Sequence, residues 1–261
     1  MNVKIFQVDA FTATLFSGNP AAVIPLKDWL PAEKMQAIAE ENNLSETAFF
    51  VESGEVYELR WFTPATEVDL CGHATLAAAH VLFSHLNYDS EEIRFETKSG
   101  ELTVQKNGKF YSMSFPQNKP ERVEPPVELL QALDIESDEV YFNTDYLVVL
   151  ENEETVKRVS PNFEKLKKVD TRGVIITAPG DDFDFVSRFF APAVGINEDP
   201  VTGSAHTLLA PLWSEKLGKT GFRAAQVSGR GGIIDCRLID NRVELTGEAI
   251  TYLTGKIELG G

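Results

Sequence analysis

The stretch RWFTPA at residues 60–65 returns in altered form as RFFAPA at residues 188–193. An acidic loop follows each copy, then a Gly-x-Ala triplet at residues 72–74 or 203–205, and then an apolar segment with the length of a helix. Internal similarity of this kind is typical of a duplicated structural unit. We therefore predict two similar lobes, each built from a strand, a turn, an acidic loop and a buried helix.

Local patterns around the first copy predict a mixture of strands and helices. Residues 3–9, 46–51 and 55–62 have strand character, and residues 31–42 have the spacing of an amphipathic helix. Residues 72–86 are apolar nearly all round, which predicts a helix buried in a core. This apolar run is far shorter than the ~20 residues of a membrane span.

The length of the chain, 261 residues, exceeds the usual size of one compact core and favours two domains. A proline-rich, polar run at residues 116–126 separates the two copies of the pattern. We place an N-terminal lobe at residues 1–117 and a C-terminal lobe at residues 118–261, and we leave open that the last strand crosses back to the N-terminal lobe.

Charge and motif content exclude several classes of function. The formal net charge is −16 and the basic residues are not clustered, which argues against nucleic acid as a partner. The N-terminus shows no signal peptide, so we expect a cytoplasmic protein. Two cysteines, Cys71 and Cys236, make neither a disulfide framework nor a metal site. Nucleotide-binding motifs are absent, and we expect no cofactor and no metal.

Five stretches occur in an order that resembles the PhzF-type, phenazine-biosynthesis-like family: VDAFT at 8–12, GNPAAV at 18–23, SETAF at 45–49, DLCGHAT at 69–75 and EDPVTGSAH at 198–206. The resemblance implies a diaminopimelate-epimerase-like fold of class α+β. In this fold each of two similar lobes is a strongly curved mixed sheet around a central helix, and the active site lies between the lobes. A homodimer is implied by the same analogy.

The resemblance also implies the site and the reaction. It makes the chain a cofactor-independent isomerase in which Glu46 is the general acid/base that moves a proton between carbons of a small carboxylate substrate. Glycines at the helix starts permit close approach of a ligand to the backbone, and the helix starts offer unpaired N–H groups to a forming negative charge. The remaining implied residues are catalytic His73 and Asp199 and substrate-binding Ser45, Gly72, Gly203 and Ser204.

The residues by themselves leave structural roles open. Glu46 could be an ordinary solvated glutamate on the surface. His73 could serve only as a hydrogen-bond partner at the helix start. Asp199 precedes Pro200 and could be a turn residue. For His73 we expect the positive end of the helix dipole to lower the imidazole pKa and favour the neutral ring. Arg230, in a glycine-rich stretch, is a carboxylate donor or a solvated side chain.

Other members of this fold class use two thiols, each just before the glycine of a helix start. Here the first position is Cys71 and the second is Thr202, whose hydroxyl cannot replace a thiol as a base. The sequence therefore disfavours a two-thiol racemase and makes Cys71 a small buried side chain. Two alternatives stay open: a two-base epimerase or racemase of a small acid, and a non-catalytic small-acid binding protein on the same scaffold.

Overall fold

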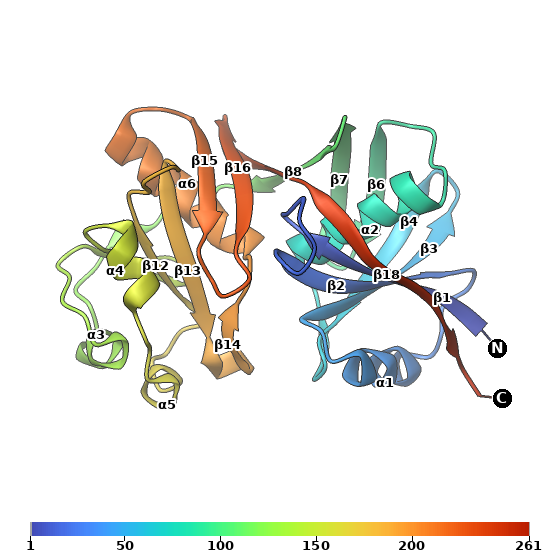
Figure 1. Ribbon diagram of the computed structural model, residues 1–261, viewed down its shortest axis with the longest axis horizontal. Coiled ribbons are helices and arrows are strands. Elements are labelled where there is room, and N and C mark those ends of the chain that lie inside the picture. Colours follow the sequence, from blue (N-terminus) through green and yellow to red (C-terminus); the bar gives the residue numbers. More distant parts are fainter. Residues whose placement is uncertain (1, 261) are drawn as a thin grey trace. The chain divides into compact units, whose positions relative to one another are not determined.

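The computed structural model describes residues 2–260, and the chain divides into two compact units. Unit 1 contains the chain up to Ser114 together with the segment from Thr246 onward, and unit 2 runs from Phe115 to Leu245. The sequence predicted a boundary after residue 117 and allowed the last strand to cross back to the first lobe. The structure has two, because the last strand joins the sheet of the first unit (Figure 1).

Unit 1 is a mixed sheet with two helices. In chain order its elements are β1 (Asn2–Ala10), β2 (Asn19–Leu26), α1 (Ala32–Asn42), β3 (Glu46–Ser53), β4 (Val56–Phe62), β5 (Glu67–Val68), α2 (Gly72–His85), β6 (Glu92–Thr97), β7 (Gly100–Asn107), β8 (Phe110–Pro116) and β18 (Ala249–Glu258). The strands and helices predicted in this part of the sequence are all present, with ends shifted by at most a few residues.

The sheet of unit 1 is held together by both ends of the chain. Strand β1 lies between β18 and β2 and is antiparallel to both, with Asn2 opposite Glu258. The two chain ends therefore lie side by side (Figure 1). Strand β2 pairs in parallel with β3, which pairs in antiparallel fashion with β4, and β4 is parallel to β6. This mixture of directions identifies a mixed sheet.

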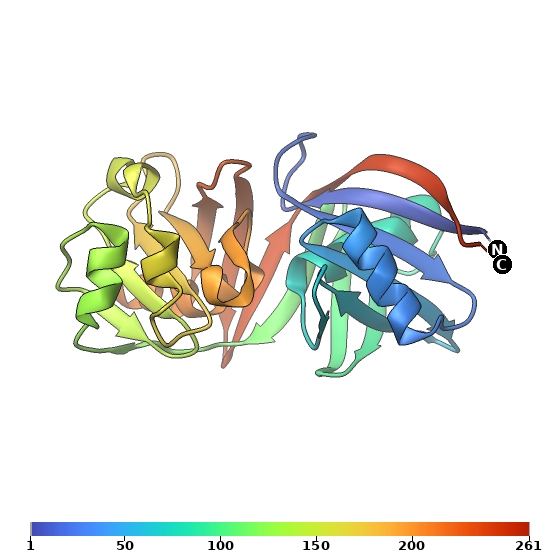
Figure 2. The ribbon, with the colours of Figure 1, turned by 90° about the horizontal axis from the view of Figure 1, so that it is seen from below.

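Helix α2 forms the centre of unit 1, and α1 covers one side of the sheet. Every side chain of α2 from His73 to Phe83 is buried, as the apolar pattern predicted. Helix α1 buries one face only, through Met35 and Ile38, in a cluster that also contains Phe49 and Phe62 of the sheet (Figure 2). An all-round apolar helix and a one-sided one thus occupy the positions that their sequences require.

Unit 2 has a mixed sheet and several short helices. Its elements are β9 (Glu121–Arg122), α3 (Val127–Leu133), β10 (Val140–Phe142), β11 (Tyr146–Val149), α4 (Glu153–Arg158), α5 (Phe163–Leu166), β12 (Val174–Ala178), β13 (Phe185–Ala191), a 3-10 helix (Pro192–Val194), β14 (Ile196–Asp199), α6 (Gly203–Leu217), β15 (Gly221–Gln226), β16 (Gly232–Ile239) and β17 (Arg242–Gly247).

Helix α6 is the buried helix of unit 2. Strand β13 pairs with antiparallel β12 on one side and with parallel β15 on the other. The side chains of α6 from Ala205 to Trp213 are buried, and the Trp213 ring stacks on Phe185 of β13 with 5.5 Å between ring centroids. Each unit therefore contains the strand, turn and buried helix predicted from the internal repeat.

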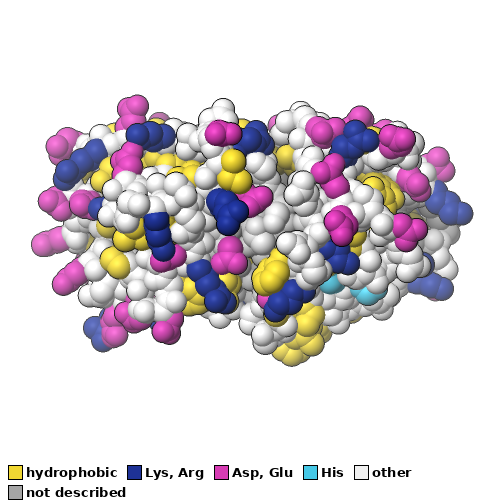
Figure 3. Space-filling model, turned by 90° about the horizontal axis from the view of Figure 1, so that it is seen from above, with side chains coloured by type: hydrophobic (Ala, Val, Ile, Leu, Met, Phe, Trp, Pro, Cys, Tyr) yellow, Lys and Arg dark blue, Asp and Glu magenta, His cyan; other side chains and the backbone are white. Residues whose placement is uncertain are grey.

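The surface carries charge of both signs. Acidic and basic side chains are interspersed on the face shown in Figure 3, although acidic residues outnumber basic ones in the sequence by 40 to 24. Among residues 2–260, no helix combines the length and the apolar character that crossing a membrane requires.

Candidate active site

The Glu46 carboxylate is placed by the connection between α1 and β3. Helix α1 ends at Asn43, which adopts the left-handed conformation that commonly closes a helix. Strand β3 begins three residues later at Glu46, which pairs in register with Ala21 of β2. The Asn42 amide donates to the Thr47 hydroxyl at 3.1 Å and ties the helix end to the strand start. Glu46 is therefore fixed at the first position of a central strand.

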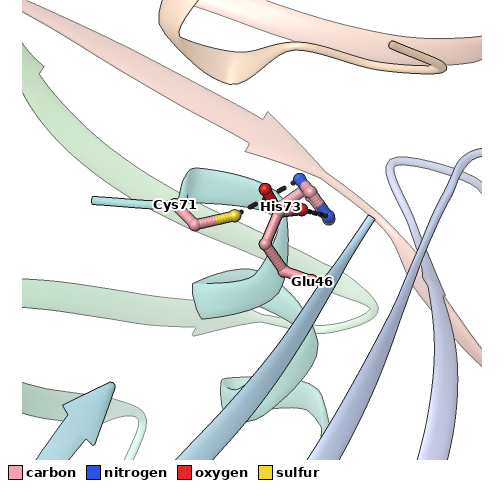
Figure 4. A group of neighbouring side chains, drawn as sticks. All are labelled: Glu46, Cys71 and His73. Carbon is pink, nitrogen blue, oxygen red and sulfur yellow. Dashed lines mark hydrogen bonds and ion pairs between the residues drawn. The ribbon is translucent and has the colours of Figure 1, made fainter. Parts of the chain in front are cut away.

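The imidazole of His73 meets Glu46 at the start of α2. Cys71 is the N-cap of this helix, in an extended conformation, and His73 is its second residue. The His73 Nε2 atom lies 3.1 Å from Glu46 Oε2 (Figure 4). Only 7% of the His73 side chain and 12% of the Glu46 side chain are exposed. A carboxylate and an imidazole thus form a pair that is nearly removed from water.

The other ring nitrogen of His73 faces two further polar groups. Its Nδ1 atom lies 3.2 Å from Asn19 Nδ2 and 3.5 Å from Cys71 Sγ. Both ring nitrogens are therefore engaged, which fixes the orientation of the ring. Asn19 is fully buried at the start of β2. It belongs to the GNPAAV stretch, in which no individual side chain was predicted to be functional.

The protonation of His73 differs from the expectation. Burial by itself disfavours a charged ring, but contact with Cys71 and Glu46 raises the pKa of His73 well above its ordinary value of 6.5. Burial also raises the pKa of the Cys71 thiol, which stays protonated at neutral pH. The charge that favours the imidazolium there is thus the Glu46 carboxylate. The prediction of a lowered pKa was wrong, because the contacts with Cys71 and Glu46 outweigh the effect of burial.

Glu46, Cys71 and His73 also bring three kinds of metal ligand together. One ligand atom of each lies within 4.8 Å of the others. The two nitrogens of the His73 ring, however, face different partners, Nε2 the carboxylate of Glu46 and Nδ1 the sulfur of Cys71 (Figure 4). A single metal ion bound by all three side chains would need one ring nitrogen of His73 to face both the carboxylate and the sulfur. In the observed arrangement the ring instead makes separate contacts with the carboxylate and with the thiol.

Two other predicted residues of unit 1 flank this pair. Ser45 directly precedes Glu46, and Gly72 directly precedes His73 and opens α2. Both are partly exposed, as is Glu46, whereas residues 47–50 of β3 and 73–83 of α2 are buried. Ser45 and Gly72 are therefore the partly exposed chain neighbours of the pair.

In unit 2, the Asp199 carboxylate is held by the residue that caps α6. Asp199 ends β14 and Thr202 is the N-cap of α6, and the Thr202 hydroxyl donates to Asp199 Oδ2. Gln226 locks the same turn: its Oε1 accepts from the Thr202 N–H at 2.8 Å, and its Nε2 donates to the Asp199 carbonyl at 2.7 Å. Gln226 is 1% exposed. These hydrogen bonds fix the position of Asp199 at the start of α6.

Ser204, the second residue of α6, contacts an arginine that the sequence did not single out. Arg172 Nη2 donates to Ser204 Oγ at 3.2 Å, and Arg172 is paired with the buried carboxylate of Asp145. Sequence separations of 32 and 27 residues leave no local pattern to connect these side chains. Gly203 opens α6 and is buried.

The glycine-rich stretch that contains Arg230 supports the turn at Asp199. The Ser228 hydroxyl donates to the Pro200 carbonyl at 2.8 Å and accepts from the Gly231 N–H at 3.0 Å. Within unit 2 the stretch therefore acts on the Asp199–Thr202 turn through Ser228. Arg230 itself is partly exposed.

Comparison with known proteins matches residues 8–255 to the family described as phenazine biosynthesis-like protein, PhzC-PhzF. The chain belongs to this family. Curated members of the family include a Pseudomonas aeruginosa protein with the name "uncharacterized isomerase", 53% identical over 99% of this chain and 100% of its own length. A mouse phenazine biosynthesis-like domain-containing protein is 42% identical, over 98% of this chain and 99% of its own length.

A solved structure from the same family, the Enterococcus faecalis phenazine biosynthesis protein of the PhzF family, is 48% identical and superposes with a TM-score of 0.97, covering 99% of this chain and 100% of its own. An Agrobacterium vitis hydroxyproline epimerase, 10% identical with a TM-score of 0.61, covering 98% of this chain and 92% of its own, shares the fold. The predicted α+β, diaminopimelate-epimerase-like class is confirmed. With three curated relatives named isomerases, this PhzC-PhzF family member is an isomerase.

Proposed function

We propose that this isomerase moves a proton between carbon positions of a small carboxylate substrate, without a cofactor, and that Glu46 is its general acid/base. The Glu46–His73 pair at the start of α2 is the observation that carries the proposal. A carboxylate that accepts a proton from carbon must be positioned and shielded from competing water, and Glu46 is 12% exposed at the first residue of a central strand.

In the proposed reaction, Glu46 removes a proton from a carbon next to an electron-withdrawing group. The electron pair of the broken C–H bond enters the π system of the substrate, and the negative charge spreads over it. The imidazolium of His73 and the first N–H groups of α2 favour that charge. Glu46 then delivers a proton to another carbon, and the double bond shifts. While the proton is on Glu46 it exchanges with solvent, so in deuterated water the product gains a deuteron. Nothing is oxidised or reduced, and no group leaves.

Unit 2 contributes binding groups to this proposal. We assign Asp199 to orienting a polar group of the substrate, because Thr202 and Gln226 hold its carboxylate and backbone in one conformation. Ser204 and Gly203 offer a hydroxyl and a helix-start backbone to the same ligand.

The test is proton exchange in deuterated water. Small unsaturated and α-substituted acids are incubated with the enzyme, and mass spectrometry identifies any acid that gains a deuteron. We expect Glu46→Gln to lower the exchange rate at least about 10³-fold, since it keeps the shape and removes the base. Glu41→Gln, at an exposed position of α1, is the matched control and should keep the full rate. Full exchange by a folded Glu46→Gln variant overturns the assignment.

A two-base epimerisation is the second candidate, and the observation that raises it is a thiol, Cys71, beside Glu46 and His73. The Cys71 thiol lies 3.5 Å from the ring of His73, so the helix start carries a second proton carrier beside Glu46. The two reactions leave different products. Epimerisation introduces the deuteron with inversion at a single stereocentre, whereas the proposed isomerisation moves a double bond, and proton NMR of the product distinguishes them.

A further inference from the structure

Arg172 is a firmly held cation near the start of α6, and the proposed function does not use it. It lies in the loop before β12, and its side chain reaches Ser204, the second residue of α6. Its Nε donates to Asp145 Oδ1 at 2.9 Å, and its Nη2 donates to Asp145 Oδ2 and to Ser204 Oγ. One edge of the guanidinium is thus fully occupied.

The anchor of this arginine is built into the core of unit 2. Asp145 is fully buried, and the guanidinium lies over the ring of Phe189 with 5.6 Å from its central carbon to the ring centroid. Gly173 makes the arrangement possible: a Cβ there would lie 2.3 Å from the Phe189 ring and 3.2 Å from Asp145 Oδ1. Because residue 173 has no side chain, the Phe189 ring and the Asp145 carboxylate can pack closely against the backbone beside Arg172.

The opposite edge of the guanidinium is open. Among residues 2–260, Nη1 of Arg172 has no hydrogen-bond partner, and 46% of the side chain is exposed although its carboxylate partner is not. An arginine that served only to neutralise a buried carboxylate would gain nothing from this exposed edge. A guanidinium held at one edge is, however, preorganised to bind a second planar acceptor at the other.

The hydroxyl of Ser204 adds a donor at the same place. Because Ser204 Oγ accepts a hydrogen bond from Arg172 Nη2, its own hydrogen is directed elsewhere and is available to a ligand. Asp199 lies near enough to affect the charge of Arg172 and would repel an anion placed on its side. Nη1 of Arg172 and the Ser204 hydroxyl are thus two neighbouring donors that a ligand carboxylate can accept from.

We propose that Arg172, together with Ser204, binds the carboxylate of the substrate, which makes a carboxylate rather than a neutral group the recognised feature. The inference rests on the proposed function only in taking its ligand to be the substrate. Arg172 contributes binding and orientation, and it takes no part in the proton transfer assigned to Glu46.

The experiment compares acids with their amides. Benzoate, cyclohex-1-ene-carboxylate and crotonate are titrated calorimetrically against wild-type protein, each beside the neutral amide of the same shape. We expect the acids to bind more tightly. Arg172→Gln should weaken acid binding at least about tenfold and leave amide binding unchanged. Arg237→Gln, at an exposed position on β16, is the control and should change neither.

Several outcomes overturn the proposal: a wild-type protein that binds none of the acids, equal binding of acids and amides, or equal weakening of both by Arg172→Gln. If that variant does not fold, Ser204→Ala takes its place, with an expected loss of about two- to fivefold for the acids alone. Glu46→Gln separates the two proposals, because it should abolish deuteron exchange and keep acid binding. If Glu46→Gln loses deuteron exchange but the wild-type protein does not prefer acids to amides, the proposal for Arg172 is refuted and the proposal for Glu46 stands.

Discussion

The starts of α2 and α6 share a backbone frame but not their chemistry. Each helix opens with glycine after an extended N-cap residue, with φ and ψ of −147° and 108° at Cys71 and −112° and 99° at Thr202. At α2 the neighbouring side chains can carry protons. At α6 the N-cap hydroxyl donates to a carboxylate, and Gln226 closes the turn. The difference teaches that a repeated frame fixes positions for side chains, and each side chain then decides what its position does.

The histidines of the two helices show the same contrast. His73 of α2 contacts a carboxylate, and its pKa is raised. His206 of α6 is fully buried, and its Nδ1 lies 2.8 Å from the Thr202 carbonyl, so this nitrogen must carry the hydrogen. Burial lowers the pKa of His206 to about 4. One helix start therefore stabilises a charged ring, and the other requires a neutral one.

The largest expected effect comes from unlocking the turn at α6. Gln226→Ala removes the acceptor of the Thr202 N–H and the donor to the Asp199 carbonyl, both in a buried region. Since an unsatisfied buried polar group costs roughly 1–3 kcal/mol, we expect the free energy of unfolding to fall by about 3 kcal/mol. Urea denaturation followed by the fluorescence of Trp213, the tryptophan of unit 2, measures it.

Gln105→Ala is the matched control for that variant. Gln105 is exposed on β7, and its side chain donates a single surface hydrogen bond to Glu92. Its loss should change stability by less than about 0.5 kcal/mol. Equal stabilities of the two variants would show that Gln226 does not hold the turn, and the contrast between the two helix starts would lose its structural basis.

The next prediction concerns pH and the two histidines. The folded-state pKa of His206 lies below its ordinary 6.5, so the unfolded chain binds more protons between the two values, and stability falls as pH drops through this window. We expect a loss of about 2 kcal/mol between about pH 7 and pH 5 from this residue. His206→Asn keeps a donor for the Thr202 carbonyl and should remove that share of the loss. Denaturation curves at several pH values measure the difference.

His73 should behave in the opposite way. Its folded-state pKa is raised, so its contribution is complete below about pH 6.5 and is lost as pH rises through the folded value. His73→Asn should therefore flatten the alkaline side of the stability profile. Burial also lowers the pKa of His80 of unit 1 to about 4. His80 therefore contributes to the loss of stability at acidic pH in the wild type and in the variants alike. The comparison is thus variant against wild type, and an unchanged acid slope in His206→Asn contradicts the assignment.

Particular residues show what the sequence could predict. The buried helices followed from their apolar runs, and the resemblance named Glu46 and His73, which the structure brings into contact. Arg172 and Gln226 could not be assigned roles, because their partners lie 27 and 24 residues away and nothing in the local pattern connects them. The helix at Phe163–Leu166 has four residues, too few to show a periodicity.

The smallest expected effect belongs to Cys71, whose position corresponds to Thr202 in the other copy. Burial keeps the thiol protonated, so Cys71→Ala should lower the rate of deuteron exchange by less than about tenfold, against about 10³-fold for Glu46→Gln. Cys236→Ala, at the buried cysteine of unit 2, is the control for removing a sulfur atom. If Cys71→Ala were as damaging as Glu46→Gln while Cys236→Ala were not, the thiol would be a second base. Such a result would favour a two-base epimerisation, because inversion at one carbon requires a proton donor other than the group that removed the proton.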